Sequence, residues 1–280
     1  MKIIFSRKGF DSQFGKQPSP VLPDGTLLSL PIPRKNDITT FGNLFYGSKS
    51  YFDIITELKP NTTIKADDTC HLDPDIRMNI SSPHPQDRNA IFGQCDAALT
   101  LLKKFDIKEE DIFLFFGWFK ETEYQNGRLR YKKNVPDLHI IYGYLQVGEV
   151  YRCDEKVPSY ARHHAHMHGS FTDVKNNAVY IAGKTFSLQN SLPGSGCFTY
   201  HPNLVLTAAG MTRSKWKPHS FFKQAMTYHH PTSFRETHFQ SAAQGQEFIM
   251  EGSDELIDWV TKLVAENRED NMIDSSLTGN

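Results

Sequence analysis

The sequence predicts an α+β fold, built as one domain on a mostly antiparallel or mixed central sheet with flanking helices. Two long apolar segments, residues 111–121 and 138–151, have the composition of buried strands that pair in the core. A C-terminal amphipathic helix starts after Ser253, which is a good N-cap residue. No internal repeat or linker-like segment is visible, so we expect a single domain over residues 1–267 and a flexible tail over residues 268–280.

Shorter elements follow from local patterns. We expect strands at residues 2–5, 27–32, 178–188 and 247–250, and helices at residues 53–58 and 95–104. Pro60 ends the first helix because proline cannot donate a backbone hydrogen bond. Gly143 and Gly148 interrupt the second long apolar segment, where we expect bends or bulges.

The composition gives no global attraction to nucleic acid or to an anionic membrane. The 280 residues include 31 basic and 32 acidic side chains, so an anionic partner must bind at a local patch. No apolar run reaches the ~18 residues of a membrane-spanning helix, and no signal-peptide region is present, so we expect no membrane partner. Four scattered cysteines form no CxxC pair, which indicates a reducing cytoplasm.

The first strand runs into a basic turn that is a candidate anion site. Ser6, Arg7, Lys8 and Gly9 follow the apolar residues, so backbone amides and two cations could hold a phosphate. A solvated basic turn is the alternative. Asp11 could orient a hydroxyl, act as a base, or cap a turn.

The segment HLDPDIR places His71, Asp73, Asp75 and Arg77 at alternate positions. In an extended chain all four side chains would point to one face and could surround a ligand, a metal ion or a reacting group. The alternative is turn formation at Asp73-Pro74.

Two further segments carry polar groups. His164, His166 and His168 could share one face of a strand, but no HExxH or finger spacing occurs. We expect these histidines to line a polar groove and assign no metal ligand. Gln244, Gln246 and Glu247 precede or open a strand, where the acid could accept a proton and the glutamines could bind a hydroxyl, or where the acid could simply be an edge-strand residue.

Six segments together resemble the family called nucleotide modification associated domain 3. They are FSRKGFDS (5–12), PSPVLPDGTLLSLPIP (18–33), HLDPDIR (71–77), FFGWF (115–119), IIYGYLQVGEV (140–150) and QGQEF (244–248). The order of a hydrophobic strand, a polar connection and a glycine-bent strand also resembles PUA-like barrels that read modified bases. The glutamate at the head of a late strand is similar to the catalytic strand of DNA-targeting ADP-ribosyltransferases.

The family resemblance implies a role in systems that hypermodify nucleic-acid bases in bacteria and phages. It favours one pocket with catalytic Asp11, His71, Asp73 and Glu247, and with ligand-binding Ser6, Arg7, Lys8, Gly9, Asp75, Arg77, Gln244 and Gln246. The expected function is group transfer at a nucleotide, at a base or at a glycosidic bond, with DNA as the favoured partner and no cofactor assigned. The alternatives are a non-enzymatic reader, which would stack bases on the aromatic strands and on Trp216, and an ADP-ribosyltransferase-like enzyme that uses NAD. The basic and aromatic stretch 213–217 suits the enzyme and the reader alike.

Overall fold

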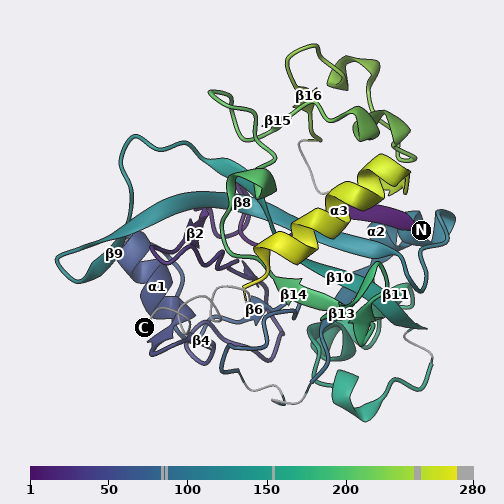
Figure 1. Cartoon of the computed structure of the whole chain (residues 1–280). Coiled ribbons are helices and arrows are strands. Elements are labelled where there is room, and N and C mark those ends of the chain that lie inside the picture. Colours follow the sequence, from purple (N-terminus) through teal and green to yellow (C-terminus); the bar gives the residue numbers. More distant parts are fainter. Residues whose placement is uncertain (83–84, 86–87, 153–154, 243–246, 270–280) are drawn as a thin grey trace, which may run out of the picture.

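A mixed nine-stranded sheet forms the centre of the protein (Figure 1). The computed structural model describes residues 1–82, 85, 88–152, 155–242 and 247–269. The main path of the sheet is β17-β1-β8-β10-β11-β7, with β2 and β9 on β8 and β14 on β10. Its strands are β1 (Lys2–Arg7), β2 (Ser19–Val21), β7 (Ile91–Cys95), β8 (Ile112–Gln125), β9 (Arg128–Tyr131), β10 (Leu138–Arg152), β11 (Asn177–Ala182), β14 (Ser195–Cys197) and β17 (Phe248–Glu251).

Helices and small two-stranded sheets surround this centre. The described residues contain the helices α1 (Tyr51–Leu58), α2 (Asp96–Lys104) and α3 (Asp254–Asn267). The small sheets pair β3 (Ile32–Pro33) with β6 (Cys70–His71), β4 (Phe45–Tyr46) with β5 (Lys49–Ser50), β12 (Thr185–Phe186) with β13 (Gln189–Pro193), and β15 (Lys215–Trp216) with β16 (Phe239–Gln240). Short 3-10 helices are η1 (Ser159–Ala161), η2 (Ala165–Met167), η3 (Gly169–Phe171), η4 (Pro202–Leu204), η5 (Ser220–Gln224) and η6 (Pro231–Ser233).

The long strands β8 and β10 pair antiparallel, which confirms the prediction from their apolar patterns. Strand β1 pairs parallel with β8 on one side and antiparallel with β17 on the other, so the sheet is mixed. The register of β10 shifts around Gly143 and Gly148, where bulges were expected. Because β1 lies between β8 and β17, its C-terminal end places Arg7 and the following turn beside strands from distant parts of the chain.

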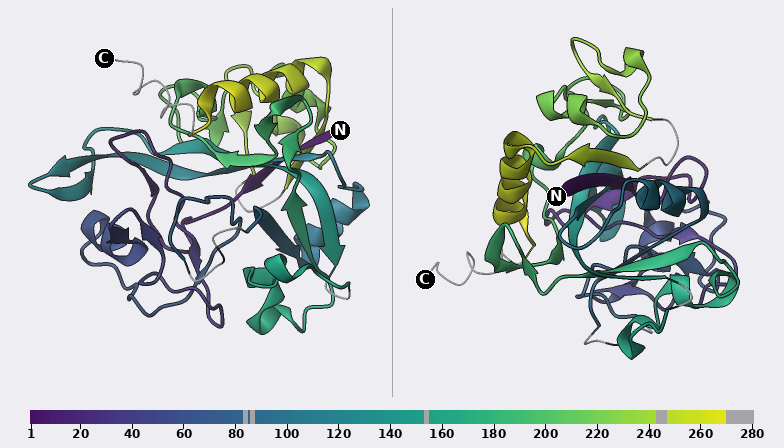
Figure 2. Two further views of the ribbon diagram at one scale, coloured as in Figure 1. Left: turned by 60° about the horizontal axis from the view of Figure 1, so that its bottom comes forward. Right: turned by 90° about the vertical axis from the view of Figure 1, so that its right-hand side faces the viewer.

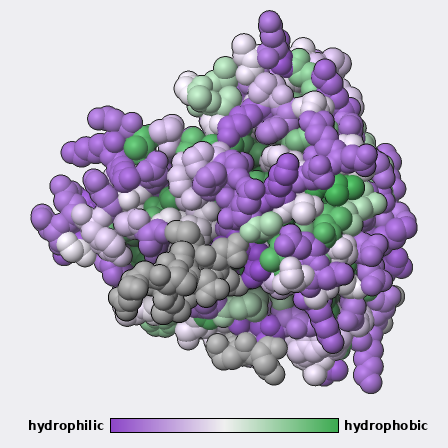
Figure 3. All heavy atoms as spheres, in the orientation of Figure 1, coloured by the Kyte–Doolittle hydropathy of each residue, from purple (hydrophilic) through white to green (hydrophobic). Residues whose placement is uncertain are grey.

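The described residues contain three hydrophobic clusters, the smallest of which surrounds Ile91 and Val179 on β7 and β11. Helix α3 packs its apolar side against one face of the long strands, together with the aromatic group around Trp216 and Phe222. A second core surrounds α1 and the N-terminal segments, with Phe10, Phe41 and Ile55 fully buried. The left view of Figure 2 shows α3 on one side of the long strands and α1 on the other. Figure 3 shows that most side chains on the face seen in Figure 1 are hydrophilic.

Three sequence expectations about local structure are wrong. Leu27, Leu28 and Leu30 are buried but form no strand: Leu27 makes an isolated bridge with Val21, the Leu30 amide donates to the Ser19 hydroxyl, and the strand β3 contains just Ile32 and Pro33. The strand expected over 178–188 breaks at Gly183 into β11 and β12. The histidine segment 163–168 does not form a strand, because local hydrogen bonds close it into 3-10 turns.

Arg268 and Glu269, at the start of the segment expected to be a tail, contact the rest of the chain. Arg268 forms a bridge with Phe198, and Glu269 makes an ion pair with Arg77. Residues 270–280, the rest of the expected tail, lie outside the described residues. Among the described residues, no helix is long and apolar enough to cross a membrane.

Candidate functional site

A cleft of about 1070 Å³ opens at the C-terminal end of β1. Its lining comes from the turn after β1, from β6 and the residues that follow it, from the end of β7, from β8 and β10, and from the 3-10 segment η2–η3. Residues 211–214 also belong to the lining. The volume is sufficient for a nucleotide-sized ligand.

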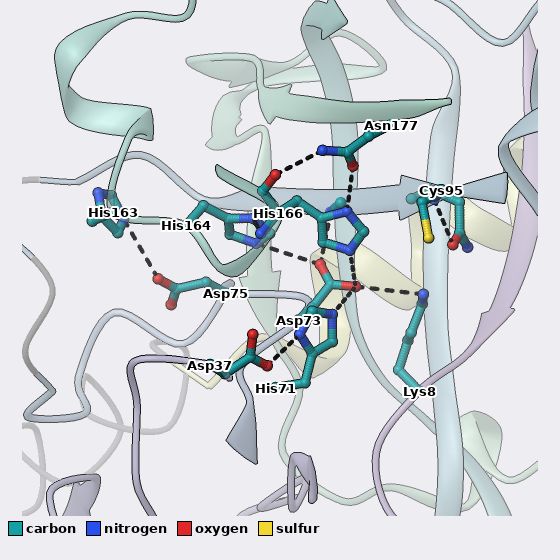
Figure 4. Close-up of polar contacts among 12 residues, drawn as sticks. Lys8, Asp37, His71, Asp73, Asp75, Cys95, His163, His164, His166 and Asn177 are labelled. Atoms are coloured by element: carbon teal, nitrogen blue, oxygen red, sulfur yellow. Dashed lines mark hydrogen bonds and ion pairs between the residues drawn. The ribbon is translucent and has the colours of Figure 1, made fainter. Parts of the chain in front are cut away.

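Three side chains that can bind metals or protons meet at one wall of this cleft. The ligand atoms of His71, Asp73 and His166 all lie within 4.8 Å of one another, and all three residues are buried (Figure 4). Both imidazole Nε2 atoms are 4.0 Å from Asp73 Oδ2. Strand β6 and the residues after it supply His71 and Asp73, whereas His166 comes from η2, about ninety residues later in the chain.

Each of the two imidazoles is oriented by a partner on its far side. Asp37 Oδ2 lies 2.8 Å from His71 Nδ1, and because an ionised carboxylate only accepts, Nδ1 carries the proton. Asn177 donates its Nδ2 to the His166 carbonyl at 2.7 Å, so its Oδ1 accepts from His166 Nδ1 at 2.6 Å. In their neutral forms both rings therefore direct an Nε2 lone pair toward Asp73.

The Asp73 carboxylate is fixed by backbone and by charge. The Gly93 amide donates to Oδ1 at 2.7 Å, and His164 Nε2 lies 3.4 Å from the same oxygen. Lys8 Nζ lies 3.5 Å from Oδ2 and over the Phe92 ring. Burial alone would raise the pKa of Asp73, but Lys8, His164 and His166 more than offset it and hold this pKa far below its ordinary value. Asp73 is therefore an anion at neutral pH.

An aromatic ring packs over the histidine pair. Phe171 stacks on His166, with ring centroids 4.0 Å apart, and on His71, with centroids 5.2 Å apart. The Arg34 guanidinium lies 4.1 Å from the centroid of the Phe171 ring. Burial lowers the pKa of His166 to about 3, although Asp73 opposes this shift.

A second part of the cleft wall carries cations and another aromatic surface. The Arg213 guanidinium lies 4.1 Å from the centroid of the Trp118 ring, a cation–π contact beside the cleft. Arg7 lines the same wall, where burial lowers its pKa, Asp11 raises it and Arg213 lowers it further. Trp216 donates its indole N–H to His139 Nδ1 at 3.0 Å, and burial lowers the pKa of His139 to about 3.

The basic turn after β1 therefore does not act as one unit. Because successive residues of a strand point to opposite faces, Arg7 lies with Arg213 whereas Lys8 lies with Asp73. Gly9 lines the cleft with φ near +82°, and a Cβ there would lie 2.6 Å from the Ser29 hydroxyl. Asp11 also lines the cleft, but its Oδ1 accepts from the amides of Gln13 and Phe14, both at 2.7 Å, so it caps a turn.

Glu247 lies behind the cleft wall, in a separate buried contact. Its Oε1 accepts from Ser6 Oγ at 3.0 Å and from Gln94 Nε2 at 2.7 Å, whereas Oε2 has no hydrogen-bond partner among the described residues. Burial raises the pKa of Glu247, although Lys8 and these two donors oppose the shift. Of these residues, Gln94 and Lys8 line the cleft. Gln244 and Gln246 lie outside the described residues.

Asp75 and Arg77 do not join His71 and Asp73, contrary to the expectation of one shared face. Asp75 binds Arg88 through both carboxylate oxygens, at 2.7 and 3.0 Å, and lies toward His163 in Figure 4. Arg77 binds Glu269 with its NH1, at 2.6 Å from each carboxylate oxygen. The alternation fails because residues 72–77 leave strand β6 and turn, so the later side chains reach other parts of the core.

Several site residues were not predicted from the sequence. Two of them lie in segments that the sequence analysis singled out: His166 in the segment expected to line a groove, and Arg213 in the basic stretch 213–217. No sequence pattern pointed to Asp37, Asn177 or Gly93, because their roles arise only from contacts with residues far away in the sequence. Cys95 also lines the cleft, and burial and Asp96 raise the pKa of its thiol to about 11, which disfavours a thiolate nucleophile at neutral pH.

Comparisons with known proteins identify one family. The sequence model of nucleotide modification associated domain 3 matches residues 2–251, which include every cleft-lining segment described above. No curated protein and no solved structure gave a match.

Proposed function

Because the chain belongs to the nucleotide modification associated domain 3 family, we propose that it is an enzyme that acts on a nucleotide or a nucleic-acid base. The observation that carries this proposal is the position of the buried His71, Asp73 and His166 cluster in the wall of a cleft, another part of which is cationic and aromatic. We call the part of the wall with His71, Asp73 and His166 the reactive wall, and the part with Arg7, Arg213 and Trp118 the recognition wall.

The recognition wall suits a nucleotide. Arg7 and Arg213 offer charged donors to a phosphate, and guanidinium groups bind phosphate with two parallel hydrogen bonds. The indole of Trp118 offers a flat surface on which a base can stack. The net charge of the chain is near zero, so this local patch is where attraction to a nucleic acid would arise.

The reactive wall suits group transfer at the base or at the glycosidic bond. Asp73 is held as an anion beside Lys8, and the two imidazoles present lone pairs toward it. We assign the chemical step to the cluster of His71, Asp73 and His166 as a unit, with Lys8 next to the reacting group. Asp11 and Glu247 have supporting roles: Asp11 shapes the turn, and Glu247 positions Gln94 and Ser6.

Two other functions receive less support from these contacts. An ADP-ribosyltransferase-like enzyme needs its glutamate at the substrate, and Glu247 lies behind Gln94. A non-enzymatic reader of modified bases would use the recognition wall but would not need the buried charged cluster. Nucleoside mass spectrometry separates the reader from the enzyme.

The test combines a cellular and a binding experiment. DNA and RNA from cells that produce the wild-type protein, the His71→Gln variant or no protein are digested to nucleosides and compared by mass spectrometry. The proposal expects a changed nucleoside profile only with the wild type. An unchanged profile in all three, together with nucleotide binding by the pure protein, would indicate a reader or an enzyme of free nucleotides.

Calorimetric titration with nucleoside monophosphates and short oligonucleotides tests the recognition wall. Loss of a charge-assisted hydrogen bond in Arg213→Ala should weaken binding about 10-fold or more. Arg128→Ala is the matched control, because Arg128 is exposed on β9 and does not line the cleft. Equal affinity of Arg213→Ala and Arg128→Ala would remove Arg213 from the ligand site.

A further inference from the structure

We propose that His71, Asp73 and His166 form a binding site for one divalent first-row transition metal ion. The inference starts from the hydrogen-bond roles of the three facing atoms. Asp37 and Asn177 occupy the Nδ1 sides of the two histidines, so both Nε2 atoms and the Asp73 carboxylate face each other as acceptors. Three acceptors that converge repel one another unless a cation lies between them.

The partners behind the histidines are of the kind that metal sites use. Metal-bound histidines almost always donate their other N–H to a carboxylate or a carbonyl group, which fixes the ring and increases its basicity. His71 has a carboxylate partner in Asp37, and His166 has an amide oxygen in Asn177. Asn177 also donates its Nδ2 to the His166 carbonyl, so hydrogen bonds with Asn177 fix both the ring and the backbone of His166.

The three ligand atoms lie further apart than in a metal-bound site, so they must move closer together when an ion binds. Two atoms bound to the same ion at about 2.1 Å lie roughly 3.4 Å apart in tetrahedral geometry. The two Nε2 atoms are each 4.0 Å from Asp73 Oδ2, and all three ligand atoms lie within 4.8 Å of one another, so the pairs must approach by roughly 0.6 to 1.4 Å for the site to close.

The donor set favours transition metals over Mg²⁺ or Ca²⁺. Two imidazole nitrogens and one carboxylate oxygen suit Zn²⁺, Fe²⁺ and similar ions, whereas Mg²⁺ and Ca²⁺ prefer oxygen ligands alone. Three protein ligands leave further coordination positions toward the cleft, which all three residues line. A substrate in the cleft would therefore reach the ion directly.

Lys8 provides an internal check on this inference. Its ammonium lies 3.5 Å from Asp73 Oδ2, the oxygen that faces the two histidines, so it competes with a metal ion for that oxygen. Removal of its charge should therefore strengthen metal binding. If Lys8 only forms a structural ion pair and no metal site exists, the variant without this charge should bind metal no better than the wild type.

The experiment uses the full chain without a polyhistidine tag, stripped with a chelator and then titrated calorimetrically with Zn²⁺, Mn²⁺ or anaerobic Fe²⁺, and with Mg²⁺ for comparison. We expect one transition metal ion per chain and much weaker Mg²⁺ binding. Asp37→Asn should weaken metal binding roughly 10- to 100-fold, as outer-shell changes do. His166→Ala should weaken it further, and Lys8→Met should strengthen it.

Controls keep the result interpretable. His201→Ala, which removes an exposed histidine outside the cleft, should leave metal affinity unchanged. Circular dichroism checks folding, and if His166→Ala fails to fold, Asp37→Asn and Lys8→Met still decide the question. Absence of transition-metal binding to the wild type, or equal affinity in wild type and Asp37→Asn, would overturn the site.

The metal titration contains no nucleotide, so it is independent of the proposed function. If metal binding fails while Arg213→Ala still weakens nucleotide binding, only the metal site is wrong. If metal binding holds while no nucleotide binds, the metal site stands and the proposed substrate class is wrong.

Discussion

The imidazole ring of His166 lies where a side chain on residue 93 would be. A Cβ on Gly93 would be 2.2 Å from His166 Cδ2 and 2.8 Å from its Nε2, which is closer than a Cβ approaches a non-bonded atom in real structures. The amide of Gly93 also donates to Asp73 Oδ1 at 2.7 Å. One glycine on β7 therefore positions two members of the buried cluster at once.

Gly93→Ala should displace His166 and impair the site. Because the added methyl group overlaps the ring, we expect at least a 10-fold loss of metal affinity and of any activity, with a lower melting temperature. Calorimetric titration and thermal unfolding measure both effects. Gly183→Ala is the matched control, since its nearest neighbour would be 3.4 Å from the new Cβ. Unchanged metal affinity in Gly93→Ala would mean that the contact does not fix His166.

Glu247→Gln should change how stability depends on pH. Burial raises the pKa of Glu247 in the folded protein, so its favourable contribution is complete at low pH and is lost as the pH rises through that raised pKa. Glutamine does not titrate and can still accept from Ser6 and Gln94. The variant should therefore gain stability over the wild type as the pH rises.

Urea unfolding at several pH values from 4 to 8 measures this difference in the free energy of unfolding. Glu251→Gln is the matched control, because Glu251 is exposed at the end of β17. A difference that stays constant with pH would show that Glu247 is not destabilised as an anion.

Arg88→Met should destabilise the fold strongly without touching the cleft. The Arg88 and Asp75 side chains are 0% and 1% exposed, so the variant leaves a buried carboxylate without its main cation. Breaking a buried ion pair on one side costs about 3–5 kcal/mol in the free energy of unfolding. Urea denaturation provides the measurement.

Two further variants test whether the loss of stability in Arg88→Met comes from the buried Asp75 carboxylate that it leaves behind. Lys108→Met removes the cation of an exposed pair with Asp106 and should leave stability nearly unchanged. The double variant Asp75→Leu/Arg88→Met should recover part of the loss, because no unpaired charge remains. A loss below about 1 kcal/mol in Arg88→Met would contradict the assignment of this pair as structural.

Trp118→Ala should weaken nucleotide binding, whereas Trp118→Phe should largely preserve it. Stacking of one base on an aromatic side chain contributes about 1–3 kcal/mol, so the alanine variant should bind roughly 5- to 150-fold more weakly. Titration with the nucleotides used for Arg213→Ala measures the effect. Equal affinities of the alanine and phenylalanine variants would exclude stacking on this residue.

Local sequence patterns were enough to predict much of the fold. The apolar runs of β8 and β10, the capping serine of α3 and the glycines at the two bulges act through neighbours in the chain. Predictions from local patterns are wrong where a backbone group forms its hydrogen bond with a side chain or with a distant segment. Leu30 is an example, since its amide donates to the Ser19 hydroxyl and not to a neighbouring strand. The histidine segment failed for the same reason, because its hydrogen bonds close short turns.

The candidate site was predictable only in part. The residues His71 and Asp73 were identified from the sequence and lie together, and Arg7, Lys8, Gly9 and Asp11 line the same cleft. Alternation alone then extended the site wrongly to Asp75 and Arg77. Alternation predicts a shared face only while the chain stays in a strand, and here the strand ends at His71.

The sequence by itself determined the α+β class, the central strand pair, the C-terminal helix and the family, because these depend on hydrophobic periodicity and on local motifs. The tertiary structure decided that His166 joins His71 and Asp73, that Lys8 and Arg7 lie on different walls, and that Asp75 belongs to the core. Those outcomes depend on packing and charge pairing between segments far apart in the chain. The energies of such contacts are set by distances and burial, and no local pattern contains them.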